Sequence, residues 1–585
     1  MNPMHKLYCL FAYCIISLLY SVEAQQWESA LSFSGQYPWP YELNPDEAVQ
    51  GFAVTPQGQK YVLGMYNCML NVGGMTITPI KPRQELFLAR FSSTGNVEWV
   101  ERISPQYNYI SDLTGRGDIY RPVNFMSVDA EGNVFVGWPF NESCQITGTN
   151  FFHPLKKLSG SALIKYSTNG IVLWAKSTDA IITAIGGSRE GGVYLAGFFR
   201  LSATFDSITL NGNWPRSMFL AKCDRAGNFS WAKQFEQAVS GGGNDFTPND
   251  LCEDQQGNIL CTGDLNGGLG GSTLDIGGTV LKANGRDQFL FKCKSDGAVL
   301  WAKQSTAGSL NSVFTLAENT DRSGNIYTIG HFGGKNIQFQ HIGFDQKLSY
   351  NTYETYIAKY DANGKVLWVQ TTSKAKGASG IGIYGSAIAQ DIVVDNAGRL
   401  LVSAVIYGSV VYDGQILKAS NEAWDGFLLQ LSSEGHLERF LTIPSISPNG
   451  LESGTVFPKC LGIDQKSAIY VAGQYVSQAT FGATHLVSTK VASQTSRSYD
   501  IFLARCSMIP LPIEFPTLQI TYSKGQYELQ ANVFGTLSFS IEATEDLRIG
   551  SWHSLTHWSG SNTLWRWIDT DAGNYGSRFY RLRQE

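Results

Sequence analysis

A short strand that contains a tryptophan recurs along this chain, and this repetition constrains the fold more than any other feature. The copies are GNVEWVER from Gly95, GIVLWAKS from Gly170, GNFSWAKQ from Gly227, GAVLWAKQ from Gly297 and GKVLWVQT from Gly364, with a weaker copy, GHLERFLT, from Gly435. An apolar strand of the FLAR type precedes each copy, as at Phe87–Arg90 and Phe219–Lys222. Two further strands lie upstream, such as FMSVD at 125–129 and VFVG at 134–137. The unit is therefore four strands on a period of about 68 residues, which is typical of propeller blades.

The turns inside the unit follow two fixed patterns. The first two strands are joined by D-x-x-G, as at Asp254–Gly257, and the last two by S/D-x-x-G, as at Asp224–Gly227. An Asp or Ser oxygen accepts from a backbone NH two residues on, and glycine takes the positive φ that a tight hairpin requires. Each turn offers one or two carboxylates, whereas calcium takes six to eight oxygens, so these turns do not predict a metal site.

Counting the strands predicts how the ring closes. The first three strands of the unit occur seven times after Gly51, but the Trp strand occurs only six times there. QQWESALS, just after the N-terminal apolar segment, places Trp27 in the missing Trp position. We expect a seven-bladed β-propeller of four-stranded blades, closed by the N-terminal strand, which pairs with the strand at Ile501–Cys506 and covers an open blade edge. The recurring tryptophans are expected to pack between blades.

At this point the chain resembles a known family, the exported bacterial β-propeller repeat (SBBP-type) proteins. The family pattern is D-x-x-G-N-x-Y-V-x-G followed by F-[VIL]-A-K-[YFL]-[DS]-x-x-G-x-x-x-W, and YIAKYDANGKVLW at 356–368 fits it best. The resemblance covers about residues 27 to 506 and implies a seven-bladed propeller. It implies no shared catalytic residues.

The ends of the chain predict export and a second domain. Lys6, the apolar run Leu7–Tyr20 and the small residues before Gln25 are typical of a signal peptide over 1–24, and the run is too short to span a bilayer. We expect the propeller at 25–510 and a C-terminal β-sandwich-like module at 511–585. The pattern at Phe539–Leu547, Trp552, Asp569 and Arg578–Leu582 resembles C-terminal accessory modules of secreted proteins from environmental bacteria. The mature chain is expected to be secreted, with no transmembrane segment.

Eight of the ten cysteines lie after the signal segment. Cys223, Cys293 and Cys506 share one repeat position that is apolar in the other copies, which indicates buried thiols. Cys252 and Cys261 flank the turn at 254–257 symmetrically, so we expect them opposite one another on one face. A disulfide between them and two free thiols both stay open.

The sequence carries no motif for catalysis or for a cofactor. It lacks H-E-x-x-H, G-x-S-x-G, a P-loop and zinc-ligand spacing, so we expect no metal and no cofactor. The net charge of −5 comes without a basic stripe, which argues against nucleic acid as a partner.

Long connections indicate where binding is expected. Both kinds of tight turn fall on one side of the ring, so the long connections gather on the other, and long loops on a rigid scaffold commonly bind partners. An aromatic rim is predicted there from Trp138, Trp214, His331, Trp424, Tyr107 and Tyr109. Folding inward to fill the loops is the alternative for each residue. The innermost strands predict channel-lining groups at Asp250, Glu253, Asp391 and Lys459, which could equally just solvate the channel mouth.

Two functions follow from this. The first is an exported, non-catalytic binding or scaffold propeller that recognises a protein or polysaccharide through its long-loop side. The alternative is an extracellular glycan-active hydrolase or lyase with its acids and bases at the channel mouth, which requires carboxylates converging on one substrate.

Overall fold

The chain forms two compact units, Met1–Met508 and Ile509–Glu585. The computed structural model describes residues 26–36, 47–80, 84–105, 124–141, 143–146, 149–152, 160–212, 216–236, 245–267, 271–308, 312–334, 336–344, 353–374, 385–420, 423–446, 454–488 and 499–508 of the first unit, and 517–523, 526–533, 538–544, 553–559, 563–570 and 579–584 of the second. All regular structure in these residues is β-strand.

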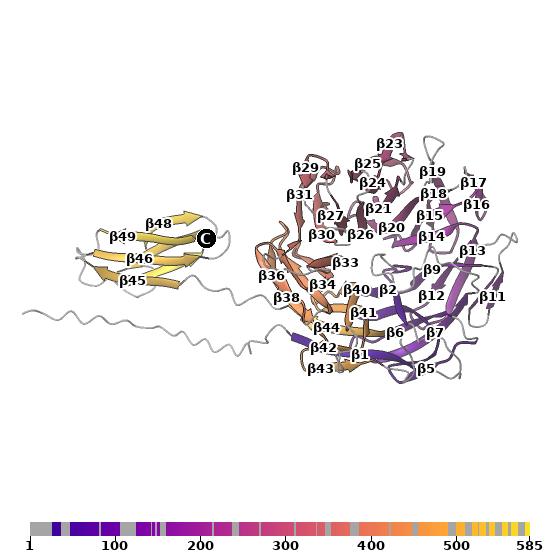
Figure 1. Cartoon of the computed structure of the whole chain (residues 1–585), viewed down its shortest axis with the longest axis horizontal. Helices are drawn as coiled ribbons and strands as arrows, with labels where there is room; N and C mark the ends of the chain where they lie inside the picture. The colour runs from indigo at the N-terminus through magenta and orange to yellow at the C-terminus, as the bar shows by residue number, and fades with distance from the viewer. Residues whose placement is uncertain are drawn as a thin grey trace, which may run out of the picture. The chain divides into compact units, whose positions relative to one another are not determined.

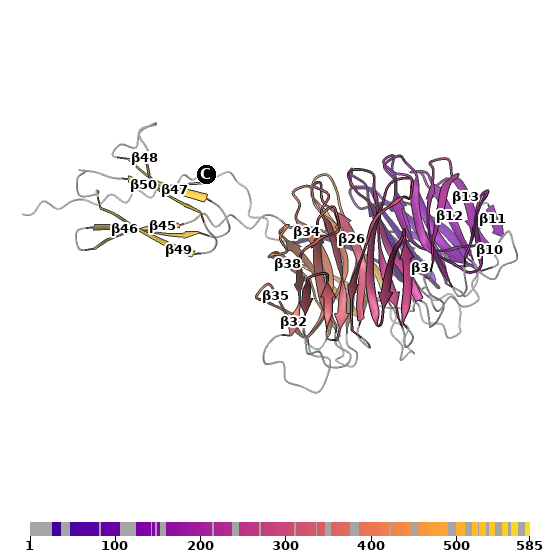
Figure 2. The ribbon, with the colours of Figure 1, turned by 90° about the horizontal axis from the view of Figure 1, so that it is seen from above.

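Four-stranded antiparallel groups recur along the described part of the first unit, arranged around a common centre (Figures 1 and 2). We number them in chain order. Group 1 contains β2 (Ala48–Val54), β3 (Lys60–Tyr66), β6 (Glu85–Phe91) and β7 (Val97–Pro105); group 2 contains β8 (Met126–Val128), β9 (Val134–Phe140), β12 (Gly160–Tyr166) and β13 (Val172–Thr178). Group 3 contains β14 (Ile181–Gly187), β15 (Val193–Phe199), β18 (Ser217–Cys223) and β19 (Phe229–Phe235); group 4 contains β20 (Asp245–Glu253), β21 (Ile259–Asn266), β24 (Arg286–Cys293) and β25 (Val299–Thr306). Group 5 contains β26 (Ser312–Thr320), β27 (Ile326–Gly333), β30 (Glu354–Tyr360) and β31 (Val366–Thr371); group 6 contains β33 (Ser386–Val394), β34 (Leu400–Tyr407), β37 (Trp424–Leu431) and β38 (Leu437–Ile443). Group 7 contains β40 (Thr455–Ile463), β41 (Ile469–Val476), β44 (Asp500–Ser507) and β1 (Gln26–Gln36).

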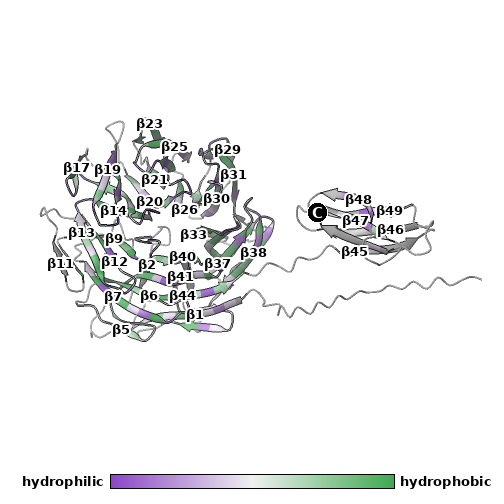
Figure 3. Ribbon diagram, turned by 180° about the vertical axis from the view of Figure 1, so that it is seen from behind, coloured by the Kyte–Doolittle hydropathy of each residue, from purple (hydrophilic) through white to green (hydrophobic). Residues whose placement is uncertain are grey.

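The second and third strands of each group are buried on both faces, because neighbouring groups pack face to face. The burial pattern of β3 and of β9 is continuous, and one apolar cluster joins Leu63 and Leu88 of group 1 to Val136 and Ile164 of group 2. Apolar residues accordingly run through the strands of the whole ring (Figure 3). The first strands lie innermost and the fourth strands outermost (Figure 1).

The predicted pairing of the N-terminal strand is confirmed, but the Trp position is shifted. β1 is antiparallel to β44, with Phe33 opposite Ile501 and Trp27 opposite Cys506. In groups 1 to 5 the Trp lies opposite the Lys or Arg that precedes the cysteine position, as Trp231 lies opposite Lys222. In group 7 that partner is Arg505, and Ser29 lies opposite it. Serine therefore occupies the Trp position of the closing strand.

The recurring tryptophans link neighbouring groups, as predicted. A Cβ built on Gly170 would lie 3.0 Å from the Trp99 indole, and the Trp99 Nε1 donates to the carbonyl of Thr168 at 2.9 Å. The indoles of Trp174, Trp231, Trp301 and Trp368 lie in the same way on Gly227, Gly297, Gly364 and Gly435 of the following group. Each of these five tryptophans fastens its group to a turn of the following group.

The within-group connections are not simple loops. Each contains a two-stranded hairpin, and these hairpins lie against the outer strand of the preceding group, as β4 pairs with β1 and β10 with β7. The hairpins are β4 (Met69–Val72) with β5 (Met75–Ile77), β10 (Ser143–Ile146) with β11 (Thr149–Phe152), β16 (Ser202–Phe205) with β17 (Ile208–Asn211), β22 (Ser272–Ile276) with β23 (Thr279–Ala283), β28 (Ile337–Phe339) with β29 (Ile342–Phe344), β35 (Ser409–Tyr412) with β36 (Gln415–Lys418), and β42 (Gln478–Phe481) with β43 (Thr484–Val487). Two short strands, β32 (Ser373–Lys374) and β39 (Ser445–Ile446), extend the outer edges to meet β35 and β42. Much of the predicted loop side is thus bracing structure.

The predicted turn chemistry is confirmed. Asp254 Oδ1 accepts from the backbone NH of Gln256 at 2.9 Å and of Asn258 at 2.8 Å, and Gly257 has a φ of 78°. We call the side of the first unit that carries these turns the turn side, and the opposite side the connection side.

The register of β20 and β21 contradicts the geometry expected for a Cys252–Cys261 disulfide. Cys252 lies opposite Leu260, and Cys261 lies opposite Leu251, so the two cysteines point to opposite faces. The first ladder pair after the turn is Glu253 with Ile259, one residue away from the symmetric register assumed from the sequence. Both thiols are free, and burial raises the pKa of each.

The second unit consists of two three-stranded antiparallel sheets. One is ordered β45 (Thr517–Ser523), β46 (Gln526–Val533), β49 (Thr563–Asp569), and the other β48 (His553–Ser559), β47 (Ser538–Thr544), β50 (Phe579–Gln584). The Tyr580 hydroxyl donates to Asp569 at 2.8 Å, which joins β50 of one sheet to β49 of the other.

Across the described residues, the structure contains no helix with the length and apolar character needed to cross a membrane.

Candidate functional site

A depression of about 460 Å³ lies on the turn side, where group 3 meets group 4. Its lining comes from three turns, the third strand β18 and the outer strand β19: Glu190 and Gly192, Lys222, Asp224, Arg225 and Ala226, Ser230 and Trp231, and Ser295 and Asp296. Charges of both signs and a tryptophan therefore surround a cavity large enough for a small ligand or a side chain of a partner.

This cavity coincides with a departure from the repeat. In groups 2 and 4 the lysine of the third strand is buried against the turn aspartate, with Lys165 3.0 Å from Asp129 and Lys292 2.7 Å from Asp254. Group 3 has Ser188 at the aspartate position. Lys222 instead donates to Glu190 Oε2 at 2.6 Å, and the Glu190 side chain is 73% exposed. In group 3 the ion pair therefore lies at the rim of a cavity. Group 5 keeps the turn aspartate, Asp321, and its lysine, Lys359, also pairs with an exposed glutamate, Glu434.

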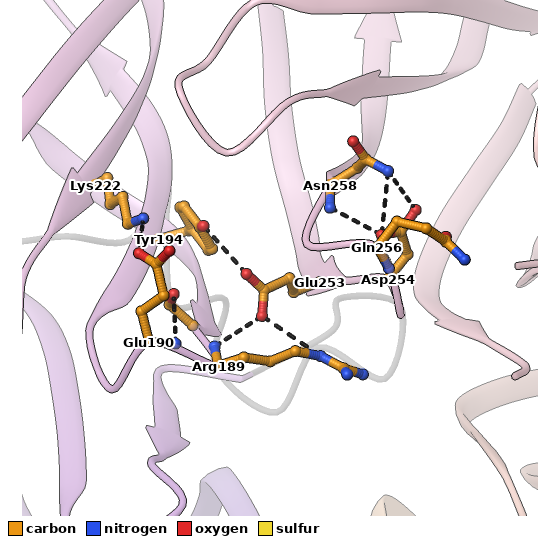
Figure 4. A network of polar contacts seen from close by, with 9 residues as sticks. Arg189, Glu190, Tyr194, Lys222, Glu253, Asp254, Gln256 and Asn258 are labelled. Carbon is orange, nitrogen blue, oxygen red and sulfur yellow. Dashed lines mark hydrogen bonds and ion pairs between the residues drawn. The ribbon is translucent and has the colours of Figure 1, made fainter.

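A second polar contact runs from the same turn to group 4 (Figure 4). Glu253, at the end of β20, accepts from the backbone NH of Arg189 at 2.7 Å and from the Tyr194 hydroxyl at 3.2 Å. The Arg189 guanidinium lies 3.7 Å from the same carboxylate. These contacts fix the Ser188–Gly191 turn against the neighbouring group.

Arg225 covers the turn from the other side. Its guanidinium lies over Gly191, where a Cβ would meet Nη2 at 2.6 Å, and it pairs with Glu131 of group 2 at 3.0 Å. Gly191 has a φ of 86°, so a side chain there would be strained as well as crowded. The Arg225 carbonyl accepts from the Trp174 indole at 3.1 Å.

Two carboxylates of the cavity, Glu190 and Asp224, are held in the charged form. The hydrogen bond from Lys222 lowers the pKa of Glu190. Burial would raise the pKa of Asp224, but hydrogen bonds from the backbone and side chain of Asn228 outweigh it, and the net shift is downward. These two groups can accept hydrogen bonds or bind cations, but neither is suited to donate a proton near neutral pH.

Trp231 lines one wall of the cavity, and its side chain is held in place by contacts with group 4. Its Nε1 donates to the Ser295 carbonyl at 3.1 Å, and its ring lies on Gly297. The indole is half-buried, so it has a structural task in addition to lining the cavity.

The predicted aromatic rim is not formed by the residues that the structure describes. Trp138 is fully buried and packs on Phe125 at 4.7 Å between ring centroids. His331 is fully buried against Phe314, and burial together with Arg286 lowers its pKa to about 3. Both side chains fill the core because each lies on a second strand, which is packed on both faces. Trp424 is half-buried against Tyr407, at 5.4 Å. Trp214, Tyr107 and Tyr109 lie outside the described residues.

The predicted channel residues fall into two sets. Asp250 and Asp391 lie on innermost strands, and each carboxylate accepts from the backbone NH of the next residue and from one on the innermost strand of the following group. Asp250 accepts from Leu251 and Glu318 at 2.9 and 3.0 Å, and Asp391 accepts from Ile392 and Leu461, both at 2.7 Å. Burial raises the pKa of Asp250 to about 6 and that of Asp391 to about 7.

The other two predicted channel residues make different contacts. Glu253 reaches the turn of group 3, as described above, and Lys459 is buried with its Nζ 5.8 Å from the centre of the Phe457 ring. The sequence placed them by strand position alone, and the bulges in the innermost strands, such as that between Pro248 and Asp250, change the direction of the side chains.

The cavity was not predicted from the sequence, although one signal for it was present. SREGG at 188–192 is the first turn of group 3, where serine replaces the aspartate of D-x-x-G, so Lys222 lacks the aspartate partner that Lys165 and Lys292 have. Among the described residues, no cluster of three or more His, Cys, Asp or Glu side chains is arranged to hold a metal ion.

Comparisons with known proteins give a coarse result. No family model matches the chain. The chain is 25% identical over 240 residues to an uncharacterized WD repeat-containing protein, L264, of Acanthamoeba polyphaga mimivirus, and the match covers 35% of this chain but only 17% of that protein. A crystal structure of a member of the DUF4221 family from Bacteroides vulgatus aligns over 82% of this chain and 97% of its own, at 9% identity and a TM-score of 0.26. The V. cholerae biofilm matrix protein Bap1 aligns over 82% and 88%, at 9% identity and a TM-score of 0.15. The chain is a β-rich repeat protein of propeller-like organisation.

Proposed function

We propose that this protein is an exported, non-catalytic binding scaffold built on a seven-bladed β-propeller, and that it takes its ligand on the turn side at the cavity between groups 3 and 4. The repeat pattern resembles SBBP-type proteins, and the pairing of β1 with β44 supports closure by the N-terminal strand. Export is supported by the N-terminal sequence pattern alone.

The observation that carries the binding role is the state of the cavity carboxylates. Glu190 and Asp224 have lowered pKa values, and both are already hydrogen-bonded. Such groups suit the recognition of hydroxyl, amide or cationic groups on a polysaccharide or a protein, whereas glycan hydrolysis needs a carboxylic acid that keeps its proton.

The alternative, a glycan-active enzyme at the channel mouth, is favoured by the raised pKa values of Asp250 and Asp391. Both carboxylates, however, use both oxygens to bind backbone amides of innermost strands. This engagement supports a structural role over proton transfer to a substrate.

The binding role is tested with a glycan array and a partner pull-down, using the mature chain and two matched variants. Arg225→Ala with Asp296→Ala removes two exposed cavity groups, and Ser93→Ala with Thr94→Ala changes the same two turn positions in group 1. Binding should be lost only in the cavity variant. Equal binding by both variants would place the site elsewhere.

Ring closure has a separate test. Deleting residues 25–34 should leave β44 as an open edge and lower the melting temperature or cause aggregation. A truncated protein that melts like the full chain would contradict closure by β1.

A further inference from the structure

The junctions between neighbouring groups are not equally fastened at their outer turn-side corners. At five junctions, from group 1/2 to group 5/6, an indole lies on the turn glycine of the following group. At the junction of groups 6 and 7, Trp27 of the closing strand donates from Nε1 to the Thr442 carbonyl at 3.1 Å. An aromatic ring therefore crosses each of these six corners.

The junction of groups 7 and 1 lacks this feature among the described residues. Ser29 occupies the Trp position of β1 and is exposed. The turn glycine that an indole would cover is Gly95, and a Cβ built on it would have no described atom within 4 Å. Ser29 in the Trp position and the absence of a packed neighbour on Gly95 are two separate observations, and both show that no described indole packs at this junction.

Other contacts hold this junction, and one of them reaches the turn. Lys60 of group 1 donates to the carbonyls of Ser92 and Ser93, and its Nζ lies 4.9 Å from the centre of the Tyr470 ring of group 7. Phe33 of β1 stacks on Phe91 at 5.4 Å, and β1 pairs with β4 toward the connection side. β1 itself stays attached to β44, so the loosely held boundary is the one between β1 and the Ser92–Gly95 turn.

We propose that the ring opens locally at this corner, so that the boundary between β1 and the 92–95 turn is a built-in opening point of the propeller. Local opening is most frequent where few buried contacts oppose it, and this corner lacks the contact that every other junction has. The proposal concerns the scaffold and does not depend on which ligand it binds.

The chain contains a matched control for the test. The turns Ser92–Gly95 and Ser167–Gly170 have the same internal bonds: the glycine NH donates to the serine carbonyl at 3.1 and 3.0 Å, and the residue after the glycine donates to the serine Oγ at 3.1 and 3.2 Å. Trp99 covers Gly170, and no indole covers Gly95. The Ser92–Gly95 turn also accepts hydrogen bonds from Lys60, so the effect of the indole is read from variants that add or remove it.

Hydrogen exchange measured by mass spectrometry on the full mature chain tests the proposal. After correction for intrinsic rates, the amides of 92–96 should exchange about tenfold faster than those of 167–171. Ser29→Trp should slow exchange at 92–96 to the rate at 167–171, and Trp99→Ser should raise exchange at 167–171 to the rate at 92–96.

Equal exchange of the two turns in the unaltered protein would overturn the proposal, as would a folded Ser29→Trp variant with unchanged exchange at 92–96. If Ser29→Trp does not fold, the unaltered protein and Trp99→Ser still decide the question. If Trp99→Ser folds and leaves exchange at 167–171 unchanged, an indole does not control these corners and the proposal fails.

Discussion

Group 3 and its two neighbours share one repeat pattern, yet they place the same lysine in different surroundings. In groups 2 and 4 the side chains of Lys165 and Lys292 are 3% and 5% exposed and face aspartates that are fully buried. In group 3 the partner of Lys222 is Glu190, which is 73% exposed. The contrast shows how a repeat protein varies a local site: the scaffold is kept, and the lysine of group 3 pairs with a glutamate at the surface instead of an aspartate in the core.

The largest expected effect comes from removing the buried ion pair of group 4, between Lys292 and Asp254. Asp254→Ala leaves the Lys292 ammonium buried without its carboxylate, which should lower the free energy of unfolding by about 3–5 kcal/mol. Urea unfolding followed by tryptophan fluorescence measures it. The matched change in group 3, Ser188→Ala, should cost less than ~1 kcal/mol. Similar losses in both variants would show that the two turns are energetically equivalent.

A second test uses pH. Asp250 and Asp254 lie only four residues apart, but their contributions to the stability of the fold should change with pH in opposite directions. Burial raises the pKa of Asp250 to about 6, so the folded state holds its proton more tightly than the unfolded chain. The contribution of Asp250 to the free energy of unfolding is fully present below the ordinary pKa of an aspartate, and it is lost as pH rises toward 6. Burial would also raise the pKa of Asp254, but hydrogen bonds from Lys292 and Asn258 outweigh it and lower the pKa. Its contribution is lost only in acid, as pH falls through the lowered pKa.

Asp250→Asn should therefore remove a decline in stability between about pH 4 and pH 6, worth about 1–3 kcal/mol for a shift of this size. Unfolding free energies measured across that range, in the variant and the unaltered protein, check the sign. A variant whose pH profile parallels that of the unaltered protein would mean that Asp250 does not titrate there.

Much of this scaffold could be predicted from the sequence, because local turn chemistry and strand periodicity repeat along the chain. The Asp254–Gly257 turn and the pairing of β1 with β44 follow from residue types and counting. Side-chain direction could not be predicted at bulges or at strand ends, and this is why Glu253 and the Cys252–Cys261 pair were misplaced. Trp138 and His331 were misplaced for another reason: the connections after them fold back as hairpins, so these residues lie in packed strands. The cavity depends on a contact between two groups, which a single-repeat pattern does not contain.

Restoring the repeat residue in group 3 gives a smaller effect. Ser188→Asp should offer Lys222 the partner that Lys292 has in group 4, and Lys222 should leave Glu190. The pKa of Glu190 should then rise toward its ordinary value, because the hydrogen bond from Lys222 is the main cause of its lowering. The change in stability should stay within about 1 kcal/mol, since one ion pair replaces another. Carboxyl-carbon NMR of the protein labelled in glutamate follows the titration, and an unmoved Glu190 pKa would show that Lys222 keeps its partner.

The smallest expected effect comes from changing the exposed ion pair of group 3, between Lys222 and Glu190. Glu190→Gln removes the charge that faces Lys222 but keeps a hydrogen-bond acceptor in place. Because Glu190 is 73% exposed, water and salt already screen the pair, and the free energy of unfolding should change by less than ~0.5 kcal/mol. The same urea unfolding used for Asp254→Ala measures it, and the ratio of the two losses is the quantity of interest. If Glu190→Gln proves as costly as Asp254→Ala, the Lys222 pair is as much a part of the core as the Lys292 pair, and the cavity rim is structural. If the cost is small, as expected, group 3 keeps a charged pair at its surface that contributes little to folding, and such a pair is free to be exchanged for contacts with a ligand.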